Sequence, residues 1–169
     1  KAVLTKLKSL NPEVIYVPGY YEEVGKIVKQ AREMGIAAPI IGGDGWDSPK
    51  LVELGGAPAL NNTFFTNHYS VDDNSPASKA FVEAYKKEYG QNPDALAVLG
   101  YDTTKLLMDA IQREKKKKKG KIQAALASTK AYPAITGATT LNASHDAVKS
   151  AVIIEMKDGK QIYKATVKP

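Results

Sequence analysis

The sequence predicts an α/β fold, in which crossover helices join the strands of a parallel sheet and a helical segment follows. Three observations support this prediction. Short apolar runs of strand length alternate with helix-length segments over residues 1–69. The loops between them are short, as in sheets whose parallel strands are linked by helices. Residues 75–129 are then almost wholly helical in pattern, before strand patterns return.

The first part of the chain alternates between the two element types. Apolar residues at helical spacing predict a helix over 2–10, which Asn11-Pro12 ends. Ser48 and Pro49 have the residue types of an N-cap and a first helical position. The predicted strands have the continuous apolar character of strands buried on both faces. The predicted strands are 14–17, 39–41 and 63–66, the intervening helices are 22–34 and 49–54, and Gly42–Trp46 is a loop.

The pattern changes after Tyr69. Residues 70–76 are polar and have the composition of a linker. Asp158-Gly159 has the sequence of a two-residue hairpin turn between two strands. The expected elements are helices over 75–89, 94–113 and 121–129, an extended segment over 139–142, and strands over 150–156 and 161–167.

The net charge of +6 comes mainly from one local run. Lys115–Lys119 contribute +5, which leaves +1 for the rest of the 169 residues. Proteins that bind DNA or RNA spread Lys and Arg over a surface, often with interleaved aromatic residues. The run is therefore interpreted as a solvated linker or helix end of low complexity. No nucleic-acid partner is predicted.

Composition excludes several other classes. The chain has no cysteine, which excludes disulfides, a thiolate zinc site and a cysteine nucleophile. No apolar run approaches the roughly 18 to 20 residues that a transmembrane helix needs. The chain opens within an amphipathic helical pattern and without an initiator Met. We therefore expect a fragment cut from something longer.

Motifs for catalysis, phosphate binding and metal binding are missing from the sequence. It contains no GxGxxG, no GxxxxGK[ST] and no GxSxG pattern. His68 and His145 are far apart and lack a carboxylate pair at ligand spacing. Asp72-Asp73-Asn74 lacks the glycine and closing Glu of an EF-hand. No enzyme activity, cofactor or metal is predicted.

The remaining candidates for binding are aromatic residues and one carboxylate. Tyr20, Tyr21, Asp44 and Trp46 follow predicted strands, where parallel sheets bind ligands, and Tyr101 lies further along the chain. A carboxylate among aromatic rings suits a small cation, since it pairs with an ammonium while ring faces add cation–π attraction. The sequence therefore predicts a site for a small ammonium-bearing molecule.

Structural interpretations of the same residues remain open. Asp44 lies between glycines, where Asp is a common turn residue. Trp46 could cover the sheet edge, and Tyr101 could belong to a helix core. Tyr20 and Tyr21 could be half-buried loop aromatics.

An ordered series of segments carries a resemblance to a known family. The segments are 14–25, 30–35, 39–46, 75–89, 100–102, 135–137 and 150–167. Together they resemble the C-terminal half of periplasmic substrate-binding proteins of ABC transporters, of the leucine/isoleucine/valine-binding type. The resemblance covers essentially the whole chain. It implies the two-lobed type I periplasmic binding fold, of which this chain would supply about half.

The resemblance also implies a map of lobes and a site. Residues 1–69 and 134–169 would form the discontinuous C-terminal lobe, and 70–133 would supply a linker and helices to the N-terminal lobe. An amino acid would bind between lobes that close on it as a hinged clamp. Asp44 matches the family's ammonium-binding carboxylate, although Glu is more frequent there, and Tyr20 matches a tyrosine of the second lobe. Trp46 would wall the pocket, and Tyr101 would lie near the hinge.

The implied partners are an amino acid, the membrane permease of an ABC importer, and the missing N-terminal half or a second chain. The implied location is periplasmic or extracellular. Groups that hold the ligand's carboxylate would come from the first lobe, outside this chain. We expect apolar surface where that half would pack, and hence association. Two alternatives remain: an enzyme on a flavodoxin-like sheet, and a self-standing engineered or truncated fragment with no ligand of its own.

Overall fold

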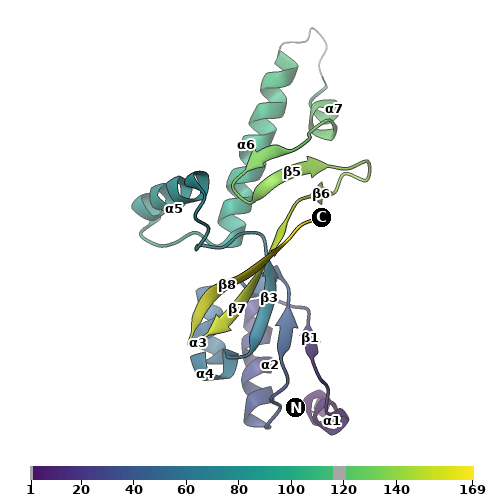
Figure 1. Cartoon of the computed structure of the whole chain (residues 1–169), viewed down its shortest axis with the longest axis vertical. Helices are drawn as coiled ribbons and strands as arrows, with labels where there is room; N and C mark the ends of the chain where they lie inside the picture. The colour runs from purple at the N-terminus through teal and green to yellow at the C-terminus, as the bar shows by residue number, and fades with distance from the viewer. Residues whose placement is uncertain (1, 116–120) are drawn as a thin grey trace. The chain divides into compact units, whose positions relative to one another are not determined.

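A computed structural model describes residues 2–115 and 121–169, and they form two compact units (Figure 1). The sheet unit comprises the chain up to Asn67 together with Val152–Ala165. The helical unit comprises His68–Ala151 together with Thr166–Pro169. Of the Lys115–Lys119 run, only the backbone of Lys115 is described, at the end of a helix, and the rest lies outside the described residues.

The sheet unit confirms the predicted parallel sheet and adds antiparallel strands to it. The strand order is β1-β2-β3-β7-β8. β1, β2 and β3 are parallel, while β7 runs antiparallel to β3. The strand bounds are β1 Ile15–Val17, β2 Ile40–Gly42, β3 Thr63–Asn67, β7 Ala151–Lys157 and β8 Lys160–Val167.

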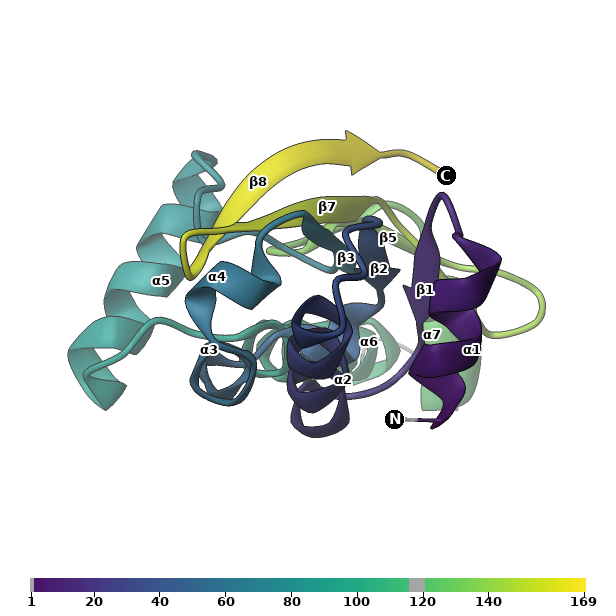
Figure 2. The same ribbon diagram turned by 90° about the horizontal axis from the view of Figure 1, so that it is seen from below.

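Helices of the sheet unit are α1 (Ala2–Leu10), α2 (Tyr21–Glu33), α3 (Pro49–Gly55) and α4 (Ala57–Leu60). Seen from below, α2, α3 and α4 lie on one side of the strands (Figure 2). Their apolar side chains form one core with the strand residues that face them. Fully buried members include Val24, Val28, Leu51, Ile40 and Phe65. The short α4 was not predicted from the sequence.

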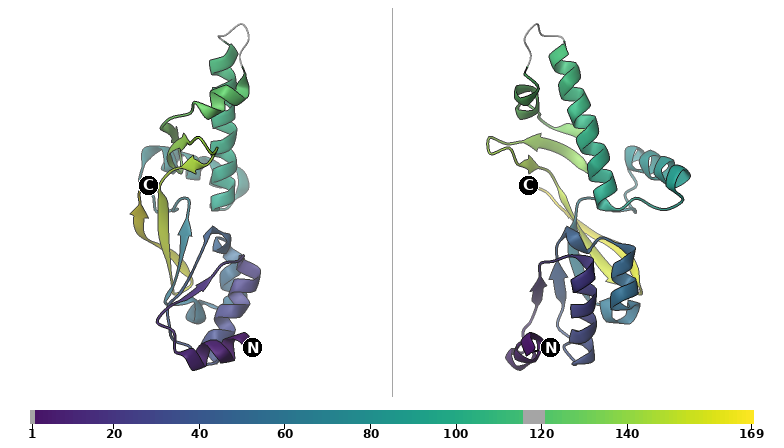
Figure 3. Two further views of the ribbon diagram at one scale, coloured as in Figure 1. Left: turned by 90° about the vertical axis from the view of Figure 1, so that its right-hand side faces the viewer. Right: turned by 180° about the vertical axis from the view of Figure 1, so that it is seen from behind.

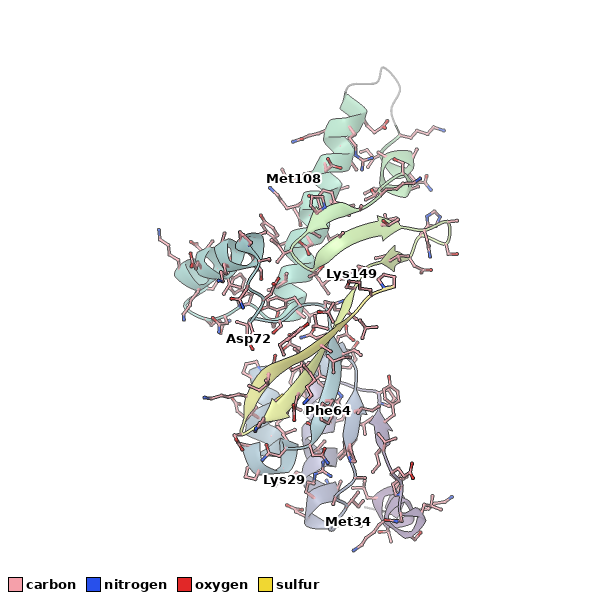
Figure 4. All side chains as sticks on the ribbon, in the orientation of Figure 1. Lys29, Met34, Phe64, Asp72, Met108 and Lys149 are labelled. Carbon is pink, nitrogen blue, oxygen red and sulfur yellow. The ribbon has the colours of Figure 1, made fainter. Side chains whose placement is uncertain are left out.

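The strands alternate between buried and exposed residues, which corrects the prediction that they are buried on both faces. Ile15 and Ile40 face the helices, whereas Tyr16 is 63% exposed and Ile41 36% exposed. Phe64, labelled in Figure 4, is half-buried. Among the described residues, the helices of the sheet unit cover only one face. The apolar opposite face accounts for the continuous apolar runs in the sequence.

Local sequence signals at the element ends are confirmed. Gly35 has φ +79° and ends α2, where the N–H of Ile36 donates to the carbonyl of Ala31 at 3.0 Å, as in a Schellman motif. The hydroxyl of Ser48 accepts from the N–H of Lys50 and caps α3. Asp158 and Gly159 both have positive φ, as a type I′ hairpin turn requires.

The helical unit contains the three predicted helices and a small sheet of order β4-β5-β6 beside α6 (Figure 3). The guanidinium of Arg113 ties α6 to α7, since its Nη1 donates to the carbonyl of Ala125 at 2.8 Å. β4 and β6 were not predicted. The element bounds are α5 Pro76–Tyr89, α6 Ala95–Lys115, α7 Ile122–Ala127, β4 Tyr132–Ala134, β5 Gly137–Leu141 and β6 Ala147–Val148.

The boundaries of the units differ from the predicted ones at 69/70 and 133/134. Residues 134–151 group with the helices rather than with the sheet. The physical reason is that β4 leads into two backbone N–H groups, of Ile135 and Thr136, which donate to the Asp102 carboxylate on α6. The assignment of these segments to lobes of a larger protein stays a prediction.

Replacing Lys149 by methionine is expected to raise the free energy of unfolding at pH 7 by about 0.5 to 1 kcal/mol. Lys149, labelled in Figure 4, has a buried Nζ without a hydrogen-bond partner within residues 2–115 and 121–169. Burial lowers the pKa of this amine below its ordinary 10.5, and the charge of Asp102 opposes the shift. Below the lowered pKa the folded state bears the full cost of the buried charge.

The sign of the pH dependence follows from that shift. Between the lowered pKa and 10.5, the unfolded chain binds a proton that the folded chain does not, so stability should rise with pH. The Lys149→Met variant should lack this contribution. Urea unfolding at pH 7 and at higher pH measures it, with the exposed Lys130→Met as a control. A variant no more stable than the parent would contradict the assignment.

Candidate functional site

Two loops lie together at the carboxyl ends of β1 and β2, where open α/β sheets bind ligands. The first is Pro18–Tyr20 and the second is 43–47, which contains the 3₁₀ turn Asp44–Trp46. We refer to them as the loop pair. A Cβ placed on Gly45 would lie 2.9 Å from Cδ1 of Tyr20 and 2.8 Å from the carbonyl oxygen of Gly19. Gly45 therefore permits the close contact between the two loops.

The structure brings two predicted site residues, Tyr20 and Asp44, to this loop pair. Tyr20 is 70% exposed, although its ring lies against Gly45, and Asp44 is exposed on the adjoining turn. Tyr21 is instead half-buried in the first turn of α2 and packs against the core. An exposed carboxylate and an exposed aromatic ring on neighbouring loops are the two kinds of group that the predicted site for a small cation needs.

Trp46 lies beneath the loop pair rather than at its surface. The indole is 0% exposed and its ring centroid lies 6.0 Å from that of Phe65. Its Nε1–H donates to the carbonyl of Val17 at 3.2 Å. The prediction that Trp46 walls a ligand pocket does not match this placement, because a fully buried ring offers no surface to a ligand. The alternative that Trp46 has a structural role fits it.

Tyr101 belongs to the helical unit and therefore does not join Tyr20 and Asp44 within one compact unit. Its ring centroid lies 4.7 Å from that of Phe81, and it is 42% exposed. The Nζ of Lys105 lies 5.9 Å from the ring centroid. A role for Tyr101 in one site with Tyr20 and Asp44 stays a prediction.

An apolar groove of about 600 Å³ runs along α5 and α6 in the helical unit. Its aromatic lining residues are Phe81, Tyr85, Tyr89 and Tyr101. On β4 of the same unit, burial and then the charges of Asp109 and Asp102 raise the pKa of the Tyr132 phenol. The groove could bury an apolar surface of a partner, but it has few polar groups that would orient a small polar ligand.

Within residues 2–115 and 121–169, no three His, Asp or Glu side chains are grouped so that they could hold a metal ion. In this part of the chain no helix is both long and apolar enough to cross a membrane.

The sequence did not predict that a side chain of the final hairpin would bond to the turn that contains Asp44. The Nε2 of Gln161 on β8 donates to Oδ1 of Asp47 at 2.7 Å. These residues are 114 positions apart, and Gln161 is an ordinary polar residue of a predicted strand. Nothing in the local pattern connects them, because the contact depends on where the final hairpin joins the sheet.

Comparison with protein families gives one match over nearly the whole chain. The family model described as "Periplasmic binding protein" matches residues 1–161. Among curated relatives, Leu/Ile/Val-binding protein homolog 2 of Brucella abortus is 27% identical over 169 residues, covering 96% of this chain and 44% of that protein.

Solved structures give closer similarity. The leucine binding protein LivK of Thermotoga maritima is 38% identical with a TM-score of 0.88, over 99% of this chain and 48% of that one. The branched-chain amino acid transporter substrate binding protein LivJ of Streptococcus pneumoniae, solved in complex with isoleucine, is 40% identical with a TM-score of 0.87. That match covers 100% of this chain and 48% of LivJ. The chain therefore spans about half the length of these solved relatives.

Proposed function

This chain belongs to the periplasmic binding protein family, and from that premise we propose that it is part of a solute-binding protein that holds an amino acid without changing it chemically. The observation that carries the proposal is the contact between the two loops that bear Tyr20 and Asp44. Both side chains reach solvent at the carboxyl edge of a parallel sheet.

The proposed mechanism is electrostatic recognition of an α-ammonium group. The carboxylate of Asp44 accepts hydrogen bonds from the ammonium, and such charge-assisted bonds are the strong ones. The ring of Tyr20 covers the cation from the side and adds cation–π attraction. No bond in the ligand is made or broken, so the protein acts as a carrier rather than an enzyme.

We propose a branched-chain or similar amino acid as the ligand. The support comes from the relatives, of which the Streptococcus pneumoniae LivJ was solved with isoleucine bound. A membrane permease of an ABC importer and a periplasmic or extracellular location belong to the same proposal. They rest on the same family relationship.

A further partner is proposed from the exposed apolar surface. The uncovered strand face carries Tyr16 and Ile41, and the α5–α6 groove is lined by aromatic rings. Surfaces of this kind mark interfaces in soluble proteins. The proposed occupant is the remaining half of a two-lobed protein, or a second chain that takes its place, and it would also supply the groups that hold the ligand's carboxylate.

The test is a thermal-shift screen of this chain with the twenty amino acids, followed by calorimetry with L-leucine, L-isoleucine and L-valine. Replacing Asp44 by alanine is expected to weaken binding by about 2 kcal/mol, or about thirtyfold, because Asp44, exposed in the free chain, becomes one partner of a desolvated charge pair once the ligand is enclosed. The exposed Glu53→Ala on α3 is the matched control and should bind as the parent does.

Two results would contradict the proposal. A loss below about twofold in Asp44→Ala would show that Asp44 does not hold the ammonium. A chain that melts cooperatively and binds none of the twenty amino acids, either alone or with the proposed partner half present, would favour the alternative of a self-standing fragment without a ligand.

A further inference from the structure

The single tryptophan of the chain is buried only two residues after the exposed Asp44. The turn between them is short and closed by two backbone hydrogen bonds. The N–H of Trp46 donates to the carbonyl of Gly43 at 3.2 Å, and that of Asp47 donates to the carbonyl of Asp44 at 3.0 Å. The backbone position of Asp44 is thus tied directly to that of Trp46.

The indole of Trp46 is held from several sides. Its Nε1–H donates to Val17, the last residue of β1, and so joins the second loop to the strand that leads into the first. Gly42 leaves the space for the ring, because a Cβ at that position would lie 2.2 Å from Cε2 of Trp46. Phe65 on β3 packs against the ring as well.

We propose that Trp46 is the positioning residue of the site, which holds the Asp44 turn at a fixed height above the end of β1. The assignment rests on the function proposed above, because Asp44 matters only where it meets a ligand. Rigid placement of a charged group lowers the ordering cost of binding, so loosening the turn should weaken affinity. A merely structural tryptophan would stabilise the core without controlling the motion of the turn.

The first experiment needs no ligand. Hydrogen exchange in the parent chain, followed by NMR, should show the indole N–H of Trp46 opening with the same free energy as the amides of Trp46 and Asp47. Only one indole resonance exists, so the assignment is unambiguous. An indole that stays protected while these amides exchange freely would overturn the proposal.

The second experiment uses the Trp46→Phe variant, which keeps an aromatic ring but removes the N–H donor. Exchange at residues 43–47 should become about threefold to tenfold faster, as expected for the loss of one hydrogen bond. The control is Leu60→Ala, which removes a fully buried side chain of the same core away from the turn. It should lower global stability and leave local exchange at 43–47 unchanged. Equal effects of both variants would make Trp46 an ordinary core residue.

A binding experiment distinguishes failure of the Trp46 proposal from failure of the proposed function. Where the parent binds L-leucine, Trp46→Phe should weaken binding by about threefold to tenfold, while Glu53→Ala should not. Unchanged affinity in Trp46→Phe would overturn the positioning role. If the parent binds no amino acid, either alone or with the proposed partner half present, the proposed function fails, and the exchange experiments still decide whether Trp46 controls the turn.

Discussion

Replacing Arg32 by methionine is expected to lower the free energy of unfolding of the sheet unit by about 4 kcal/mol. Arg32 lies in the last turn of α2. Its Nη1 donates to the carbonyls of Ile36 at 2.7 Å and Ala38 at 2.8 Å. Its Nε and Nη2 reach three more carbonyls at 3.3 Å, those of Ala59, Asn61 and Asn62.

The size of the effect follows from what the guanidinium satisfies. A hydrogen bond to a charged group contributes about 1.5 to 3 kcal/mol, and Arg32 makes two short ones. Methionine can fill part of the volume but leaves carbonyls of two connecting loops without a donor. Burial lowers the pKa of Arg32, yet the guanidinium remains charged because its ordinary pKa is so high. Arg32→Lys should recover little, since a single ammonium has three donors at one point and cannot reach five acceptors that surround a guanidinium.

Urea unfolding of the parent, Arg32→Met and Arg32→Lys measures this prediction. Lys29→Met is the matched control, because Lys29 is an exposed cation on the same helix, labelled in Figure 4. The control should change the free energy of unfolding by no more than about 0.5 kcal/mol. A loss below about 1 kcal/mol in Arg32→Met would show that water replaces the guanidinium at these carbonyls.

Arg32 illustrates which parts of the fold the sequence could predict. Its neighbours in the chain showed where α2 ends, because Gly35 at positive φ is a local requirement. The carbonyls near position 60 are about 30 residues away and carry no side-chain signature. The sequence therefore predicted the helix start at Ser48-Pro49 and the turn at Asp158-Gly159, which depend on local residues. It did not predict the contacts between loops that are far apart in the chain.

In the candidate site too, the sequence predicted the positions of some residues and not of others. Tyr20 and Asp44 were correctly expected on neighbouring loops, because the carboxyl ends of parallel strands meet at one edge, and their role in binding a ligand stays a prediction. The prediction that Trp46 walls the pocket was wrong, because the sequence does not show whether an aromatic residue in a loop points to solvent or into the core. The reason for its burial is Gly42, whose missing side chain makes room for the indole.

In the helical unit, replacing Asp102 by alanine is expected to lower the free energy of unfolding by about 3 kcal/mol. Asp102 on α6 is only 7% exposed. One of its carboxylate oxygens accepts from the N–H of Ile135 at 2.8 Å and the other from that of Thr136 at 2.9 Å. Alanine would leave two backbone donors without their acceptor at the point where β4 meets α6.

Asp102→Asn separates geometry from charge. The amide keeps one acceptor oxygen but turns a donor toward the second N–H, so about 2 kcal/mol of the loss should remain. Asp109→Ala is the control on the same helix, because Asp109 forms a half-exposed pair with Arg113 that contributes at most about 0.5 kcal/mol. Urea unfolding gives the free energies, and amide exchange at Ile135 and Thr136 locates the change.

The Asp102 substitution should also change the pH dependence that is predicted for Lys149, because the charge of Asp102 acts on the pKa of the Lys149 amine. The charge of Asp102 opposes the lowering of the Lys149 pKa, so its removal should lower that pKa further. The amine in Asp102→Ala would then lose its proton at a lower pH, and the pH-dependent rise in stability should begin earlier. Asp102→Ala in the Lys149→Met background should lack this rise while keeping the loss at the two amides. If stability still rises with pH in this double variant, a group other than Lys149 titrates. If neither the Ile135 nor the Thr136 amide exchanges faster, the Asp102 carboxylate does not hold β4 to α6.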